Sequence, residues 1–227
     1  MRAYDLHVRA ANSSTDPTFH ALCATAHELG FAGLAVETPT ALTTKPASPD
    51  VPLYRRTTLS LPNAARLRML TEQWRTRTDI LVVHCRTKPL GLTAAAAPAV
   101  DLLMLRDLTD FAAFDSQVGR ALAKANKPIE VCLSGFLQTS GSQRSRLMRS
   151  MAGATSAIVR AGCRLVLTSG ASTSSGLRAP RDLAALAYLA AIPEDLAELG
   201  VYDVPAGLIE QVELRTRGTP RTKEGTA

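Results

Sequence analysis

IEVCLSGFLQTSGSQRSRLMRSMAGATSAIVRAGCRLVLT, residues 129–168, is the stretch that decides the fold. It begins and ends with short apolar runs, 129–133 and 164–168, that lack the strict alternation of a half-exposed strand. Such runs are typical of parallel strands buried on both faces. Between them, residues 142–161 have helical periodicity and are followed by Gly162, a residue type that commonly ends a helix. The stretch therefore predicts a strand–helix–strand unit with parallel strands.

The same alternation extends over the rest of the chain. Further strands are expected at residues 3–8, 33–37, 53–59, 80–85 and 100–105. Further helices are expected at residues 18–29, 63–75, 111–125 and 180–189, with shorter ones near 93–98 and 193–199. Asp16-Pro17 and Gly30 mark the start and the end of the first of these helices. The alternation predicts one domain, residues 1–215, on a parallel α/β sheet that is either open or closed.

Two segments stand outside this pattern. Residues 38–52 are rich in Thr, Pro and Ser and are expected to form an exposed loop. Residues 216–227 are polar and basic without an apolar anchor, and we expect a disordered tail there.

Composition limits the class of protein. The 227 residues carry a net charge of +6, which is permissive for nucleic acid without demonstrating it. No apolar stretch is long enough for a membrane span, and the N-terminus has no signal-peptide core. The cysteines are widely spaced and lie mostly in apolar runs, so buried free thiols in a reducing cytoplasm are expected rather than a zinc site.

The helix at residues 142–161 has two different faces. Its expected buried stripe consists of Leu147, Met151, Ala154, Ile158 and Ala161. Its opposite face gathers Arg146, Arg149 and Arg160, with Arg144 near the helix start. A solvated surface explains these arginines, and so does a phosphate or partner surface, because the guanidinium fork matches phosphate geometry.

Polar residues near the expected strand ends permit other chemistry. Asp5-Leu6-His7-Val8-Arg9 resembles the H-x-H strand of metal-dependent hydrolases of the polymerase-and-histidinol-phosphatase type, with Arg9 in place of the second His. A metal-dependent phosphoesterase would use Asp5, His7, His84 and Asp182. A phosphate-binding metabolic enzyme would use Gly170, Gly176 and Arg178 in a late loop. No G-x-S-x-G elbow supports a serine nucleophile.

Four segments together resemble one family, the thirty-kilodalton protein subunit of archaeal and eukaryotic nuclear ribonuclease P. They are YDLHV (4–8) with LGFAGLAV (29–36), KPIEVCLS (127–134) with RSR (144–146), RLVLTSGA (164–171) and LRAPRDL (177–183). Two positions depart from the family pattern. Thr168 stands where the family often has Ser, and Leu92-Thr93 stands where archaeal members commonly have Asn-Arg.

The resemblance implies a single TIM-like (β/α) barrel and a role in removing the 5′ leader from precursor tRNA. Under it the chain is non-catalytic, with no catalytic, metal or cofactor residue of its own, because the RNA holds the Mg²⁺. The implied partners are the ribonuclease P RNA, precursor tRNA, a smaller ferredoxin-like-fold subunit and other ribonuclease P proteins. The expected RNA- or partner-binding residues are Arg144, Arg146, Arg149, Arg178 and Arg181. The expected polar residues of the barrel mouth are Asp5, His7, Glu130, Ser169 and Asp182. Alternatives remain the metal-dependent phosphoesterase, the metabolic enzyme and a basic scaffold for another RNA.

Overall fold

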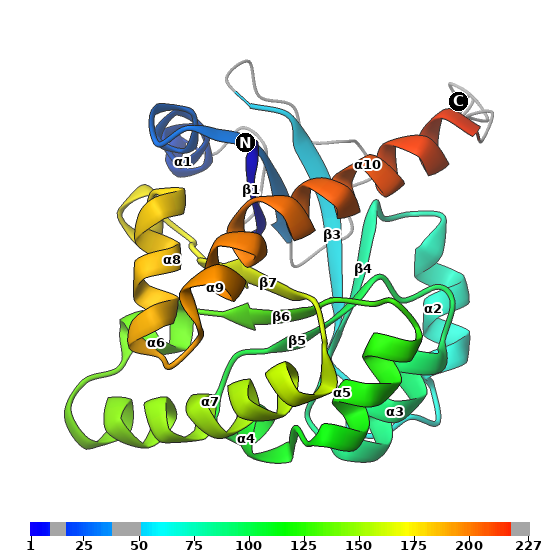
Figure 1. Ribbon diagram of the computed structural model, residues 1–227. Helices are drawn as coiled ribbons and strands as arrows, with labels where there is room; N and C mark the ends of the chain where they lie inside the picture. Colours follow the sequence, from blue (N-terminus) through cyan, green and yellow to red (C-terminus); the bar gives the residue numbers. More distant parts are fainter. Residues whose placement is uncertain (10–16, 38–50, 219–227) are drawn as a thin grey trace.

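The protein is a barrel of parallel strands, described here by a computed structural model that covers residues 1–9, 17–37 and 51–218 (Figure 1). Seven strands pair in chain order from the first to the last, and every pairing is parallel. The strands are β1 (Ala3–Arg9), β2 (Phe31–Glu37), β3 (Leu53–Leu59), β4 (Ile80–His84), β5 (Leu102–Leu105), β6 (Ile129–Cys132) and β7 (Leu165–Thr168). The expected parallel α/β fold is confirmed, with strand bounds within two residues of those expected.

The sheet closes on itself between β1 and the residues that follow β7. The backbone N–H of Gly170 donates to the His7 carbonyl at 3.0 Å, and that of Arg9 donates to the Ala171 carbonyl at 2.8 Å. Val8 and Ala171 form a parallel bridge. These bonds complete a TIM-like barrel, as the family resemblance implied.

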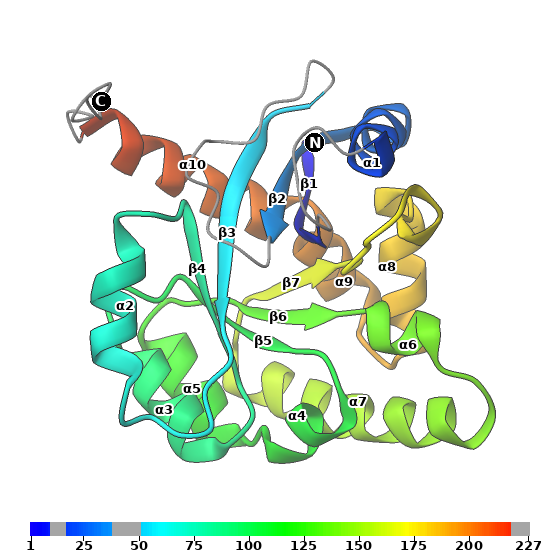
Figure 2. The ribbon, with the colours of Figure 1, turned by 180° about the vertical axis from the view of Figure 1, so that it is seen from behind.

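Most helices lie outside the ring of strands (Figures 1 and 2). They are α1 (Pro17–Glu28), α2 (Leu67–Arg75), α3 (Lys88–Ala96), α4 (Leu108–Ala113), α5 (Ser116–Lys124), α6 (Ser134–Gln138), α7 (Gly141–Ala161), η1 (Ser174–Gly176), α8 (Pro180–Leu189), α9 (Glu194–Val201) and α10 (Asp203–Gly218). The single helix expected at 111–125 is wrong, because two helices occupy that region. Asp107 and Asp115 each accept backbone N–H groups at a helix start, so each begins a new helix. The expected starts near 63 and 93 also shift, to Leu67 and Lys88.

The core has two parts, one on each face of the sheet. The larger part fills the space between the strands and the outer helices, and includes Leu147, Met151, Ala154 and Ile158 of α7. The expected stripe of α7 is therefore buried, apart from the partly exposed Ala161. The smaller part fills the barrel interior with Tyr4, Leu6, Ala35, Tyr54, Ile80, Val82, Leu102, Met104, Cys132 and Val166.

Helix α10 closes the amino-terminal end of the barrel. Its Leu208, Ile209 and Val212 join the interior cluster. Tyr54 donates its hydroxyl to Glu213 at 2.9 Å, and Arg215 pairs with Asp101, just before β5, at 2.6 Å. The sequence patterns had predicted no helix here.

Several other expectations can be placed on the structure. The expected start of the tail at residue 216 falls inside α10, and 219–227 lie outside the described residues, as do Asp16 and 38–50 of the expected loop. All four cysteines are buried thiols outside any disulfide, as expected. Among the described residues, no helix is both long and apolar enough to cross a bilayer.

Candidate nucleic-acid interface and barrel mouth

A β-bulge in β1 sets up the polar interior at the carboxyl end of the barrel. Asp5 pairs with Leu34 and Val8 with Val36, so β1 contains one more residue than β2 over this stretch. A bulge re-aims side chains, and here Leu6 and His7 both reach the barrel interior. The Asp5 carboxylate accepts the backbone N–H of His7 at 3.1 Å and lies 3.3 Å from the N–H of Ser169 after β7. Asp5 therefore ties the bulge to the closing strand.

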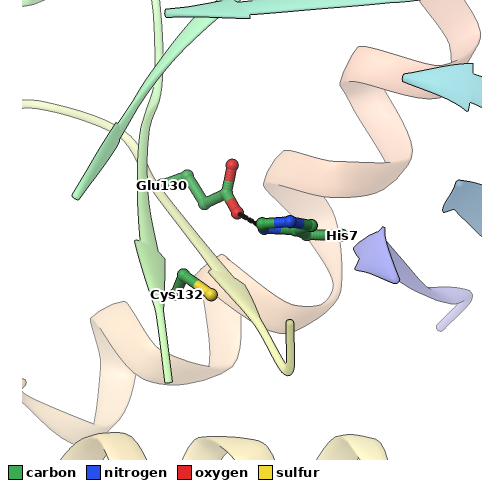
Figure 3. Close-up of side chains that lie close together, drawn as sticks. All are labelled: His7, Glu130 and Cys132. Atoms are coloured by element: carbon green, nitrogen blue, oxygen red, sulfur yellow. Dashed lines mark hydrogen bonds and ion pairs between the residues drawn. The ribbon is translucent and has the colours of Figure 1, made fainter. Parts of the chain in front are cut away.

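His7 lies between two carboxylates inside the barrel. Its Nδ1 is 2.9 Å from Glu130 Oε1, and its Nε2 is 2.9 Å from Glu37 Oε2. Figure 3 shows Glu130 and Cys132 on the same strand, facing His7. Burial and Arg56 lower the pKa of His7, but Cys132 and Glu130 outweigh them and hold it well above 6.5. Since both ring nitrogens face carboxylate oxygens, His7 is an imidazolium that donates on both sides.

Arg56 supplies the second buried cation. This residue of β3 is 3% exposed, and its guanidinium lies 2.7 Å from Glu130 Oε2 and donates to the Leu6 carbonyl at 2.7 Å. Burial raises the pKa values of Glu37 and Glu130, yet His7 and Arg56 lower both to about 2. His7, Glu37, Arg56 and Glu130, called here the mouth cluster, thus combine two cations with two carboxylates.

The charges of the mouth cluster decide whether a metal ion fits beside His7 and Glu130. The ligand atoms of His7, Glu130 and Cys132 lie within 4.8 Å of one another, which is close enough for a shared metal ion. Glu130, however, already engages Arg56, His7 and the Thr168 hydroxyl, the last at 2.7 Å. Its charge is therefore balanced by protein groups, which does not fit a resident divalent cation.

The ligands expected for a phosphoesterase are not gathered at one point. His84 bonds Asp110 rather than any mouth-cluster residue. Asp182 lies exposed in the first turn of α8. Of the five polar residues expected at the barrel mouth, the structure brings together Asp5, His7, Glu130 and Ser169 and leaves Asp182 apart.

The expected RNA-binding arginines lie on helices and loops that follow the carboxyl ends of the strands. Arg146 and Arg149 are exposed on the first half of α7, and Arg181 is exposed on α8. Arg144 is half-buried, donates to the Thr139 carbonyl at 2.7 Å and stacks over Phe136 with 5.3 Å between guanidinium and ring centre. Its planar group is thereby fixed in orientation.

Arg178 is also fixed, because its guanidinium donates to the Ser175 and Leu177 carbonyls at 2.8 and 2.6 Å. The exposed Arg86 follows β4, and the half-buried Arg106 follows β5 at the same end of the barrel. The carboxyl-end arginines are Arg86, Arg106, Arg144, Arg146, Arg149, Arg178 and Arg181. None of them forms an ion pair with a carboxylate in residues 1–9, 17–37 or 51–218.

At the opposite end of the barrel, three arginines pair with carboxylates. Arg55 pairs with Asp79 at 3.1 Å, and Arg75 and Arg215 pair with Asp101 at 2.6 Å each. The seven carboxyl-end arginines, which have no carboxylate partner among the described residues, lie at the end where barrels place their functional loops.

The sequence patterns did not predict a role in the site for Glu37, Arg56, Arg86 or Arg106. Arg56 had a detectable signal, because a charged residue in an expected strand must be paired when that strand is buried. Arg86 and Arg106 each follow an apolar run directly, as functional residues at strand ends do. The partner of Arg56 could not be inferred, because it depends on which side chains converge inside the barrel.

The sequence of this chain is similar to those of known proteins. The sequence matches the profile of the family described as RNase P subunit p30 over residues 2–217. The chain belongs to this family. Ribonuclease P protein component 3 of Methanosarcina barkeri strain Fusaro is 25% identical over 213 residues, 92% of this chain and 89% of the relative. The protein of the same description from Methanosarcina acetivorans is 26% identical over 211 residues, covering 91% and 88%.

Solved structures support the fold of this RNase P subunit p30 family member. One chain of a cryo-EM structure of archaeal ribonuclease P with mature tRNA aligns with a TM-score of 0.77 at 14% identity, covering 97% of this chain and all (100%) of that one. A crystal structure of an amidohydrolase aligns with a TM-score of 0.55 at 11% identity, covering 92% and 74%. At these identities both likenesses show the fold alone.

The structure also places the departures from the family pattern. Thr168 keeps a hydroxyl where the family often has Ser, and it donates that hydroxyl to Glu130. Leu92 and Thr93 lie on the outer helix α3, where the Thr93 hydroxyl donates to the Pro89 carbonyl.

Proposed function

We propose that this chain is a protein subunit of ribonuclease P that supports a catalytic RNA in removing the 5′ leader from precursor tRNA in the cytoplasm. The observation that carries the proposal is the family match over residues 2–217. The chain itself contributes no catalytic group to that reaction, and Mg²⁺ bound by the RNA supplies the metal chemistry. A smaller ferredoxin-like-fold subunit and further ribonuclease P proteins are its protein partners.

The carboxyl-end arginines support contact with RNA phosphate. Guanidinium groups without carboxylate partners can release condensed counterions when they meet phosphates, and this release favours binding. Phe and Tyr are scarce, since aromatic residues make up 4% of the chain, so base stacking is a minor mode of contact. Recognition by shape and backbone charge is expected instead.

The assembly is tested by purifying a tagged copy of the chain from native cell extract, sequencing the RNA that co-purifies and assaying the eluate on precursor tRNA. One structured RNA together with 5′-leader cleavage is the expected result. Recovery of the protein without RNA, from an extract whose ribonuclease P is intact, would contradict the proposal.

The interface is tested by substitutions on α7. Arg144→Gln, Arg146→Gln and Arg149→Gln, combined in one chain, are expected to weaken RNA binding and to make its salt dependence shallower. Each lost phosphate contact reduces the slope of log affinity against log salt by about 0.7–0.9. Binding is measured by titrating labelled ribonuclease P RNA at several salt concentrations.

Arg77→Gln is the matched control for these substitutions, because Arg77 is an exposed arginine between α2 and β4, at the amino-terminal end of the barrel. The control is expected to leave the slope unchanged. Equal slopes for the triple variant and the control would show that α7 does not contact RNA phosphate, whatever the outcome of the purification.

The phosphoesterase alternative has a direct test of its own. It requires Asp5, His7, His84 and Asp182 to act together, whereas the structure places His84 against Asp110 and Asp182 on α8, apart from Asp5 and His7. Activity of the purified chain on small phosphoesters in the absence of RNA would support the phosphoesterase function.

A further inference from the structure

A hydrogen-bonded chain of three side chains lies outside the mouth cluster. Ser60, which follows β3 directly, has its Oγ 2.9 Å from His84 Nδ1 at the end of β4. His84 Nε2 is in turn 2.6 Å from Asp110 Oδ2 in α4. The three residues come from consecutive strand–helix connections at the carboxyl end of the barrel, the end where barrel enzymes hold their reactive groups.

Asp110 fixes the orientation of His84. Its Oδ2 also accepts the backbone N–H groups of Arg106 and Asp107, at 2.9 and 3.1 Å, so the carboxylate cannot rotate freely. Burial raises the pKa of Asp110, but the bonds from His84 and from these backbone amides outweigh it and hold the pKa below its usual value. Asp110 is therefore an ionised acceptor, and His84 Nε2 carries the proton between them.

In a neutral imidazole with its proton on Nε2, Nδ1 has no hydrogen and can accept a hydrogen bond. Ser60 Oγ then donates to Nδ1, as a serine does when an imidazole is poised to take its proton. His84 and Asp110 are buried, at 1% and 0% exposure, whereas Ser60 is exposed. Ser60 therefore lies on the solvent side of the pair, with the imidazole behind it.

We propose that Ser60, His84 and Asp110 form a nucleophilic relay that makes Ser60 reactive toward carboxylic esters. This activity is additional to the role in ribonuclease P and does not depend on it. The two ring nitrogens are exchanged relative to the usual serine-hydrolase arrangement, but such a relay is defined by the geometry and roles of its members.

The reaction balances without any oxidant, reductant or metal. Ser60 Oγ attacks the ester carbonyl while its proton passes to His84 Nδ1, and Asp110 stabilises the imidazolium. The carbon–oxygen bond to the alcohol then breaks, and the proton on Nδ1 leaves with that alcohol. Water attacks the acyl-Ser60 ester in the same way, which restores the hydroxyl and releases a carboxylic acid.

The test uses the full chain and a fluorophosphonate probe, which bonds covalently to activated serines. One phosphonate per chain is expected by intact-mass measurement, and peptide mapping is expected to place it on Ser60. Ser60→Ala removes the adduct. Ser172→Ala is the matched control, because Ser172 is another exposed serine, in the connection between β7 and α8, and its loss leaves the labelling unchanged.

His84→Gln tests the base. General-base assistance contributes about 10²–10⁴-fold, so labelling of Ser60 is expected to slow by at least about 100-fold, and hydrolysis of p-nitrophenyl acetate with it. If His84→Gln does not fold, labelling of the unsubstituted chain and of Ser60→Ala still decides the matter. An unlabelled chain, an adduct on another residue, or equal rates with and without His84 would each overturn the proposal.

Discussion

Arg56→Met is expected to lower the free energy of unfolding by about 3–5 kcal/mol, because it leaves the two carboxylates of the mouth cluster with one cation in place of two. Arg56 faces Glu130 at 2.7 Å, and both side chains are fully buried. A Met side chain has a volume similar to that of Arg, so a lost charge rather than a cavity dominates the effect. The midpoint of thermal unfolding should fall by roughly 6–20 °C. Urea unfolding followed by circular dichroism measures the change.

Arg55→Met is the matched control, since Arg55 is the neighbouring residue on β3 and pairs with Asp79 near the surface. Partly exposed pairs contribute about 0–1 kcal/mol, so this variant should remain close to the parent. Adding Glu130→Gln to Arg56→Met should recover part of the lost stability, because it removes an uncompensated charge. Equal effects of the two Met variants would show that the mouth cluster does not stabilise the barrel.

The positions of the strands could be predicted from the sequence for a physical reason. Strands buried on both faces are mainly apolar, and segments such as residues 80–83 and 102–105 show this directly. The break between α4 and α5 was missed because helical periodicity continues across it. A new helix begins at this point because the Asp115 carboxylate accepts hydrogen bonds from two backbone N–H groups.

Less of the candidate site than of the fold could be predicted from the sequence. His7 and Glu130 were selected because polar residues stood near expected strand ends, but their partners Glu37 and Arg56 come from other strands. The bulge that turns His7 inward has no signature in residues 4–8. Helix α10 was missed although its Val204, Leu208 and Val212 recur at helical spacing, and their packing on the interior cluster depends on closure of the barrel.

Asp5→Asn is expected to change the pH dependence of stability. Burial raises the pKa of Asp5 from 3.8 to about 6, against the opposing hydrogen bonds from Ser169 and His7. Between these two values the unfolded chain has lost this proton while the folded chain still holds it. Rising pH therefore favours the unfolded state, and the contribution of Asp5 to stability is fully present below pH 3.8 and lost above about pH 6.

The size of this change follows from the two pKa values. The gap between 3.8 and about 6, at about 1.4 kcal/mol per pKa unit, corresponds to about 3 kcal/mol. Asparagine does not titrate, so the free energy of unfolding of the parent minus that of Asp5→Asn should fall by about 3 kcal/mol between pH 3.5 and pH 7. Taking this difference cancels Glu37 and Glu130, which are common to both chains and whose lowered pKa values act in the opposite direction as the pH falls.

Urea unfolding of both chains across this pH range measures the difference, with Asp182→Asn as the matched control for loss of an exposed carboxylate. A difference between the parent and Asp5→Asn that stays constant or rises with pH would mean that Asp5 is ionised in the folded barrel at low pH. The bulge at β1 would then be held by a carboxylate that bears its charge throughout, and Ser169 and His7 would have to supply stronger hydrogen bonds than their distances of 3.3 and 3.1 Å indicate.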